Sequence, residues 1–231
     1  LVHYKGKAAH AAMAPAEGVN ALNAAMLGVM GVHAQRETFR EQDVVRFHPI
    51  ITHGGDLVNV VPDDVRMESY VRAATIEALT GSNQKIDRAL RAGADAVGAT
   101  VTIQDLPGYL PMNNNQKLNQ VFRGNAETVF GASQVMEGAH EAGSTDTGDL
   151  SHIMPVIHPW LGCVSGALHS KDYTVADTEA AYIKSAQALA MTIIDLLYGE
   201  GEPAETILAD YKPLLTKEQY LEFLNSFSQQ S

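Results

Sequence analysis

Two kinds of hydrophobic spacing follow one another in this chain, and their order constrains the fold more than any other feature. In "VRMESYVRA", residues 65–73, apolar and polar side chains alternate, which places Val65, Met67 and Val71 on one face of a strand. Directly afterwards, over residues 76–97, apolar residues recur at the three- and four-residue intervals of an amphipathic helix. A strand followed at once by a long helix needs a sheet whose face that helix can cover.

The same two spacings define six elements over residues 1 to about 110. We expect strands at 2–5, 44–51, 65–73 and 99–106, and helices at about 17–33 and 76–97. In the first helix we expect Val19, Leu22, Met26 and Val29 to face inward. The order strand, helix, strand, strand, helix, strand predicts a ferredoxin-like, split-βαβ domain with one antiparallel sheet and two helices on one face. The other face, with Arg66 and Arg72, is then open to solvent or to a ligand.

The second region, residues 111–231, has few strands for its length. Its expected elements are a helix at 116–130, a possible strand at 133–138, a strand-like stretch at 156–162, loops at 141–155 and 166–173, a long helix from about Asp177 and a last helix at 216–227. In the long helix we expect Ile183, Ala186, Ala190, Ile193 and Leu197 to face inward. We therefore expect two domains, 1–110 and 111–231, in an α+β or α/β fold. The missing strands are expected in a part of the protein that precedes Leu1, so the chain reads as a fragment.

Composition excludes several function classes. The net charge of −11 disfavours a nucleic-acid partner, because phosphate backbones need a basic face. We find no apolar run approaching the roughly 18–20 residues of a membrane span, and no secretory signal. Cys163 is the one cysteine, so no internal disulfide forms, which fits a cytoplasmic protein.

Several polar residues are candidates for chemistry, and each also has a simpler explanation. His10 lies among alanines after a Lys-Gly-Lys turn, either as a surface histidine or as a catalytic group that reaches out of its own domain. Arg72 could bind a carboxylate or lie on a wet strand face, and Asn59 could serve the Pro-Asp turn that follows it. His169, in the loop "GALHSKDY", is a candidate metal ligand.

The loop "GSTDTGD" is a further candidate. Gly143 lets a backbone approach a ligand closely, while Ser144, Thr145 and Asp146 offer hydrogen bonds. The simpler reading is that one of these polar residues caps a short helix through residues 150 and 151. Local spacing encodes no complete metal site, because the chain contains neither a His-Glu-x-x-His motif nor paired cysteines.

Three stretches together resemble one family. They are "YKGKAAHAAMAPAEGVNALNA", "GGDLVNVVPDDVRMESYVRA" and "GSTDTGDLSHIMPVIHPWLG" followed by "GALHSKDY". The chain resembles the dinuclear-zinc amidohydrolases and carboxypeptidases that include aminoacylase, glutamate carboxypeptidase and aminobenzoyl-glutamate hydrolase, and within them the aminobenzoyl-glutamate hydrolase and dipeptidase-like branch. The resemblance implies a dimerisation, or lid, domain at 1–110, followed by the C-terminal portion of an α/β zinc-peptidase catalytic domain.

The resemblance also implies roles. His10 matches the lid histidine that enters the partner subunit's active site and polarises the scissile carbonyl. Asn59 and Arg72 match lid residues that hold the substrate and its carboxylate. The Gly143, Ser144, Thr145, Asp146 loop matches a wall of the substrate pocket, and His169 matches the final zinc ligand. The implied cofactor is zinc, as two divalent metals in the intact enzyme, with manganese or cobalt as alternatives.

The implied activity is hydrolysis of an amide bond in N-acyl amino acids, aminoacyl-glutamates or dipeptides. The family's other zinc ligands and its glutamate base match no segment here, so we expect the chain alone to be inactive. We expect a homodimer through residues 17–50 and no membrane contact. The alternative is a non-catalytic dimerisation or ligand-binding module built on the split-βαβ unit.

Overall fold

The computed structural model describes residues 1–138 and 143–226, and these form two compact units. The first unit contains residues 1–111 together with 143–145 and 217–226. The second contains residues 112–138 and 146–216. Each unit is described below by itself. The domain boundary that we place between residues 110 and 111 stays a prediction.

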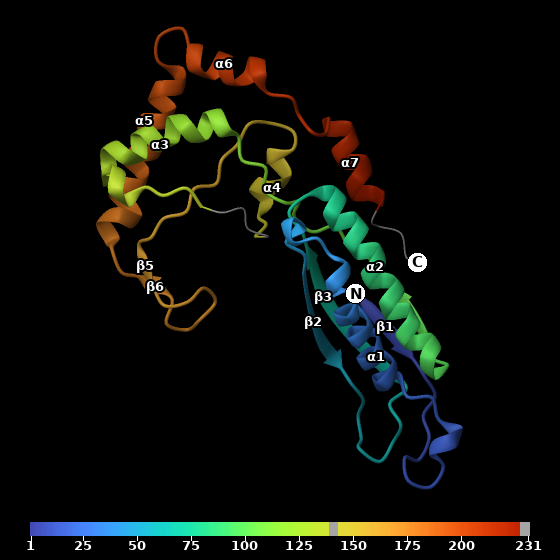
Figure 1. Cartoon of the computed structure of the whole chain (residues 1–231). Coiled ribbons are helices and arrows are strands. Elements are labelled where there is room, and N and C mark those ends of the chain that lie inside the picture. The colour runs from blue at the N-terminus through green and yellow to red at the C-terminus, as the bar shows by residue number, and fades with distance from the viewer. Residues whose placement is uncertain (139–142, 227–231) are drawn as a thin grey trace. The chain divides into compact units, whose positions relative to one another are not determined.

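An antiparallel four-stranded sheet forms the centre of the first unit (Figure 1). Its strands are β1 (Val2–Lys5), β2 (Arg46–His53), β3 (Asp64–Arg72) and β4 (Thr100–Ile103), in the spatial order β2-β3-β1-β4. Helices α1 (Ala21–Ala34) and α2 (Ile76–Val97) cover one face, and α7 (Lys217–Ser226) also belongs to this unit. All neighbouring strands run antiparallel. The split-βαβ order predicted from the spacing is confirmed.

The core of this unit lies between the sheet and the two helices. On β3, Val65 and Met67 are fully buried, as the alternation predicts, while Arg66, Glu68 and Tyr70 point to the exposed face. From α2, Ile86 and Leu90 complete the buried cluster. The open face of the sheet therefore carries charged and aromatic side chains that the helices do not cover.

Helix α1 differs from the expectation in its start and in its buried face. The helix begins at Ala21, with the Asn20 side chain accepting a hydrogen bond from the Asn23 amide at 3.0 Å, because Pro15–Glu17 form a separate 3₁₀ turn. Its buried residues are small ones: Ala21, Ala24, Ala25, Gly28 and Val32. Leu22 and Val29 pack at the edge of the core, whereas Met26 is half exposed, so the expected inward face is partly wrong.

Close packing of α1 on α2 explains this choice of face. A Cβ atom built on Gly93 of α2 would lie 2.3 Å from the backbone nitrogen of Gly28 in α1, so the two backbones meet where neither residue has a side chain. Beside them, the buried Tyr4 hydroxyl donates a hydrogen bond to the Leu90 carbonyl oxygen at 3.0 Å. Burial raises the pKa of Tyr4 above its usual value.

The second unit is mainly helical. Its elements are α3 (Gln116–Phe130), α4 (Asp146–Ser151), β5 (Val164–Ser165), β6 (Thr174–Val175), α5 (Ser185–Leu197) and α6 (Glu202–Asp210), with a π-helical turn at Glu179–Lys184 before α5. The expected helix at 116–130 is confirmed. The expected strands at 133–138 and 156–162 are wrong. Ala132–Gln134 form a 3₁₀ turn, and the backbone near residues 156–158 bonds instead to Asn115 and to the Asn114 side chain.

The long apolar helix also turns a different face inward from the one expected. Asp177 caps its start, because its side chain accepts a hydrogen bond from the Ala180 amide at 2.9 Å. Ala188 and Thr192 are buried, whereas Ile183, Ile193 and Leu197 are more than half exposed. The polar side chain of Asn125 in α3 selects this face by donating hydrogen bonds to Thr192 and Asp195.

Two further observations concern the last third of the chain. The expectation that no apolar run approaches the length of a membrane span is wrong: Glu179–Leu197 is long and apolar enough by length and composition, a test that core helices of soluble proteins also pass. Helix α6 is not among the expected elements. Pro203, which cannot continue a preceding helix, occupies the first turn of α6, where its missing N–H group costs nothing. The expected helix at 216–227 is present as α7, and Phe227 lies outside the described residues.

Candidate functional site

His10 and Asn59 lie in two loops of the first unit that pair with each other. The amide of Ala11 donates to the Asn59 carbonyl oxygen at 2.9 Å, and the amide of Val61 donates to the Ala9 carbonyl oxygen at 2.9 Å. Between these two bonds His10 stands opposite Val60 in an isolated bridge. The structure therefore brings together two predicted site residues that are far apart in the sequence.

The backbone around His10 fixes the chemistry of its ring. The Nδ1 atom accepts hydrogen bonds from the amides of Ala12, at 3.2 Å, and Met13, at 3.1 Å. A nitrogen that accepts two amide protons carries no proton itself, so the neutral ring holds its proton on Nε2. The side chain is exposed, and the described residues offer Nε2 no hydrogen-bond partner. The arrangement leaves Nε2–H as a donor for a group from outside this unit.

Exposed apolar side chains lie on the same two loops as His10. Met13 is 84% exposed, Leu57 is 64% exposed and Val58 is fully exposed. Large apolar residues grouped on loop tips mark surfaces that another molecule covers. The paired loops therefore present a hydrogen-bond donor within an apolar rim.

Arg72 lies at the opposite end of β3 from these loops. The strand has nine residues and starts at Asp64, just after Asn59, so Arg72 is about 27 Å farther along the sheet. Its guanidinium lies over the Tyr70 ring, with 5.7 Å between the guanidinium carbon and the ring centroid. The structure does not bring Arg72 to the His10–Asn59 pair within one chain.

The predicted pocket-wall loop runs into α4. Asp146 is the first residue of that helix, and its side chain accepts a hydrogen bond from the Thr147 amide at 3.0 Å. Gly143 is exposed, and a Cβ atom there would meet nothing within 4 Å. Ser144 and Thr145 are half buried. The short-helix reading describes Asp146 well, and a pocket-wall role for the four residues stays a prediction.

His169 occupies the loop of the β5–β6 hairpin in the second unit. It is exposed and adopts a left-handed backbone conformation with φ of 62°. Such a conformation is uncommon outside glycine and recurs at functional positions. The loop is tightly closed, since Gly166 has φ of 81° and a Cβ atom on it would lie 2.4 Å from the Asp172 carbonyl oxygen. This closure holds the imidazole of His169 at the hairpin tip.

The described residues do not hold a metal by themselves. Within residues 1–138 and 143–226, no group of three or more His, Cys, Asp or Glu side chains comes together. A catalytic zinc needs about three protein ligands, and His169 supplies one. The donor set of the described residues therefore does not fit a complete metal centre.

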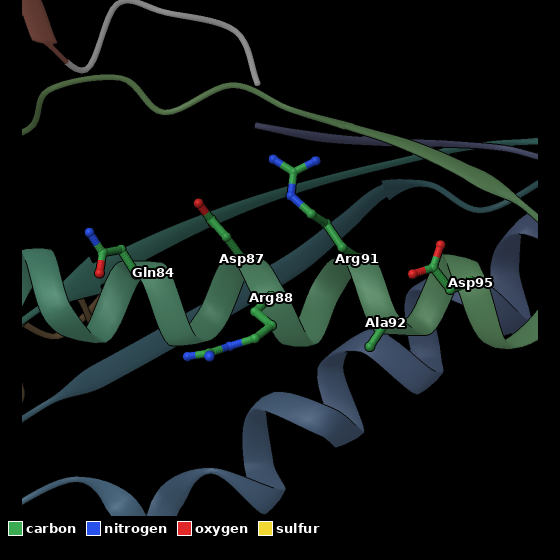
Figure 2. A pocket seen from close by; sticks show the side chains of 6 residues that line it. All are labelled: Gln84, Asp87, Arg88, Arg91, Ala92 and Asp95. Carbon is green, nitrogen blue, oxygen red and sulfur yellow. The ribbon is translucent and has the colours of Figure 1, made fainter.

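An open hollow runs along the outer surface of α2, away from the predicted site residues. Its lining residues are Gln84, Asp87, Arg88, Arg91, Ala92 and Asp95. Figure 2 shows Gln84, Asp87 and Arg91 pointing to the same side of the helix. Burial, together with the nearby Asp105 carboxylate, raises the pKa of Asp87 to about 6. Sequence reasoning missed this carboxyl pair, because Asp105 comes from the segment after β4 and no local spacing joins it to Asp87.

Comparison with known families gives one match to a family model. Residues 1–97 match the model of the peptidase dimerisation domain of M20 peptidases. The matched segment contains β1, α1, β2, β3 and α2, which is nearly the whole split-βαβ unit.

Two curated proteins are similar over most of this chain. The Xaa-Arg dipeptidase of Mus musculus is 35% identical over 231 residues, which cover 95% of this chain and 52% of the relative. The Xaa-Arg dipeptidase of Homo sapiens is 35% identical over 237 residues, with the same coverage. The chain thus spans about half the length of the curated relatives it matches.

Solved structures share the fold at lower identity. The aminopeptidase PepT from Bacillus cereus matches with a TM-score of 0.59 and 21% identity, over 85% of this chain and 50% of that one. An aminohydrolase from methicillin-resistant Staphylococcus aureus, described as putative, matches with a TM-score of 0.60 and 17% identity, over 84% of this chain and 50% of that one.

Proposed function

Since this chain belongs to the M20 metallopeptidase family, we propose that it is the dimerisation lid and an adjoining part of the catalytic domain of an amide hydrolase. The proposed substrates are N-acyl amino acids, aminoacyl-glutamates or dipeptides. The 35% identity to the Xaa-Arg dipeptidases, over 95% of the chain, supports a dipeptide-sized substrate. We further propose that the enzyme is cytoplasmic, in keeping with its unpaired Cys163.

The hydrogen bonding of His10 is the observation that carries this proposal. Amide hydrolysis passes through a tetrahedral intermediate in which negative charge develops on the former carbonyl oxygen. A neutral imidazole with its proton on Nε2 can donate a hydrogen bond to that oxygen without first taking up a proton. The amides of Ala12 and Met13 hold the ring in this form before any substrate arrives, and such preorganisation lowers the barrier.

We propose that His10 performs this role in the active site of a second copy of the chain. The apolar rim of Met13, Leu57 and Val58 is then covered by the partner's cleft, which also excludes water from the reacting oxygen. The homodimer is proposed to form through residues 17–50. Within this range α1 exposes Met26, Leu27 and Met30, and Ile50 is exposed on the edge strand β2.

The length of β3 supports a proposal in which Asn59 and Arg72 of one protomer contact different substrates of the dimer. A dipeptide is far shorter than the roughly 27 Å that the nine-residue strand spans, so one substrate cannot touch both residues of one protomer. We propose that a substrate meets His10 and Asn59 from one protomer, while its carboxylate is bound by Arg72 of the other. The Gly143, Ser144, Thr145 and Asp146 loop is proposed to line the same pocket.

The proposed enzyme uses two divalent metals, most simply zinc, with manganese or cobalt as alternatives. His169 is proposed as one ligand, and the remaining ligands and the base belong to the half of the enzyme that this chain does not span. We therefore expect the 231-residue chain alone, mixed with zinc or manganese, to show no turnover of N-acyl amino acids or dipeptides. Metal-dependent turnover by the purified chain would contradict this expectation.

Mixing two inactive variants of the intact enzyme tests the shared site. We expect His10→Ala and His169→Ala each to lower kcat by about 100-fold or more. In a mixed dimer, the subunit with intact His169 receives intact His10 from its partner. Equal mixing should therefore restore about one quarter of the wild-type activity, since half of the dimers are mixed and each has one complete site.

Two outcomes would contradict the proposal. If the mixture stays as inactive as the separate variants while energy transfer between differently labelled variants shows that subunits have exchanged, His10 acts within its own subunit. If His10→Ala alone retains wild-type kcat, the imidazole has no part in the reaction. Arg88→Ala, at an exposed position on α2 and outside residues 17–50, is the control and should leave kcat unchanged.

A further inference from the structure

Two arginines face each other on the open side of the sheet in the first unit. Arg46 on β2 is paired in register with Arg72 on β3. The next pair along, Phe47 and Val71, packs into the core. Because side chains alternate along a strand, both guanidinium groups lie on the face that the helices leave open. Like charges directly opposite each other destabilise a strand pair, so we expect another interaction to offset the repulsion between these two arginines.

The described residues supply no carboxylate to balance this pair. Asp43, whose carbonyl oxygen binds the Ala74 amide just past β3, is held by Arg40 through hydrogen bonds of 2.9 and 3.1 Å. Glu68 lies on the same strand face but four residues from Arg72, about 13 Å along β3. Neither Arg46 nor Arg72 forms an ion pair with any acid among residues 1–138 and 143–226.

The other end of the same face shows the contrasting arrangement. There the Asp64 carboxylate accepts hydrogen bonds from Lys5, from His3 at 3.2 Å and from Arg66 at 3.1 Å. These hydrogen-bond donors, with Lys5 first among them, hold the pKa of Asp64 well below its usual range. The sheet therefore neutralises its cations at one end and leaves them unbalanced at the other.

The guanidinium groups of Arg46 and Arg72 are also available to bind an anion. The Arg72 guanidinium lies over the Tyr70 ring, and the structure gives it no hydrogen-bond acceptor among the described residues. Arg46 donates one hydrogen bond to the Val45 carbonyl oxygen at 3.1 Å. A guanidinium group has five N–H donors, so the remaining ones are available for a ligand. Side chains of directly paired residues start about 5 Å apart, so both forks can reach one small anion.

We propose that Arg46 joins Arg72 in a two-arginine site that binds a carboxylate on the open face of the sheet. Two guanidinium groups fit the two oxygens of one carboxylate, and the ligand removes the repulsion between them. The assignment of the ligand as the substrate's carboxylate rests on the proposed function; the anion site itself does not. In this reading Arg46 determines the affinity for the free carboxylate end of the substrate.

Thermal unfolding of the 231-residue chain tests the site without any turnover. The probe is N-acetylglycine at constant ionic strength, and its uncharged analogue N-acetylglycinamide is the blank. At about ten times the dissociation constant, the carboxylate should raise Tm by about 3 °C. Arg46→Gln and Arg72→Gln should each abolish this rise, while Arg66→Gln, on the same face near Asp64, should keep it.

Each of the other outcomes decides whether Arg46 and Arg72 together bind a carboxylate. An undiminished rise in Arg46→Gln excludes Arg46, and an equal rise with N-acetylglycinamide excludes a carboxylate site. A larger rise with inorganic phosphate, lost in the same two variants, would overturn the carboxylate assignment. Should a glutamine variant fail to fold, Arg46→Lys keeps the charge without the fork, and we expect it to bind about tenfold more weakly.

The intact enzyme separates this inference from the proposed function. There Arg46→Gln should raise KM for an N-acyl amino acid at least tenfold and leave kcat within about twofold of wild type. An enzyme that hydrolyses no amide would refute the proposed function, yet the Tm rise of the chain would still establish the anion site. A fall in kcat with unchanged KM would overturn the binding role of Arg46.

Discussion

At the scale of single residues, the neighbours of a titratable group decide what it can do. His10 could be picked out from the sequence because an imidazole among alanines is unusual, and the family resemblance supplied its role. Its protonation pattern could not be predicted, because the two amides that bind Nδ1 depend on the turn that the loop forms. A residue type is visible in a sequence, but a tautomer follows from the folded backbone.

Asp87 gives a pH-dependent prediction at this scale. Burial first, and then Asp105, raise its pKa to about 6, so the folded state binds a proton more tightly than the unfolded state, where the pKa is about 3.8. The stabilisation is present below pH 4 and is lost as the pH rises through 6. Asp87→Asn should therefore gain stability relative to wild type as the pH rises from 4 to 7.5.

The size of this gain is limited by solvent. The full pKa difference corresponds to about 3 kcal/mol, and because Asp87 is only partly buried we expect about 1 kcal/mol. Urea unfolding at pH 4, 6 and 7.5 measures it. Asp95→Asn, at an exposed position on the same helix, is the control. A constant difference between Asp87→Asn and wild type over this pH range would refute the prediction.

At the scale of helices and strands, spacing predicted which elements form and failed on which faces they bury. The boundaries of α2 and α3 follow the apolar period closely. For α1 and α5 the inward face was predicted mainly from the spacing of large apolar residues. The faces that are buried carry alanine, glycine and threonine instead. Small residues allow two helix backbones to approach each other closely. A prediction based on the spacing of large apolar side chains does not detect such a face.

Gly93 tests this close approach. Gly93→Ala would place a methyl group 2.3 Å from the Gly28 backbone nitrogen and 2.5 Å from the Ala24 carbonyl oxygen, so α1 must move away from α2. We expect a loss of about 2–4 kcal/mol in the free energy of unfolding. Gly81→Ala, on the same helix with nothing within 4 Å, should be neutral or gain up to about 1 kcal/mol. Equal effects of the two changes in urea unfolding would exclude the packing argument.

At the scale of the whole molecule, the exposed edge strand β2 and the exposed apolar residues of α1 are surfaces that another protein molecule is expected to bury. In the proposed homodimer, Met30, which is 63% exposed on α1, becomes buried. Met30→Glu should weaken association about 100-fold or more, because an unpaired charge would be desolvated at the interface. Sedimentation velocity at micromolar concentrations measures the change.

Met136 supplies the control for this prediction. It is 87% exposed and lies in the second unit, outside residues 17–50, so Met136→Glu should leave association unchanged. A wild-type chain that remains monomeric at tens of micromolar would contradict the homodimer. The sequence could predict this surface only through the family resemblance, since apolar period alone does not tell a face that meets a partner from one that meets the core.

The position of β1 in the middle of the sheet has a consequence for biosynthesis. Both neighbours of β1, β3 and β4, come much later in the chain, and no local hairpin can hold β1 in the meantime. As the chain leaves the ribosome, the apolar segment around Val2 and Tyr4 therefore waits until residue 72, and then residue 103, has emerged. During that interval it is a natural site for a chaperone to bind, and arrested nascent chains of increasing length should lose their protease sensitivity at the first strand only after β3 is released.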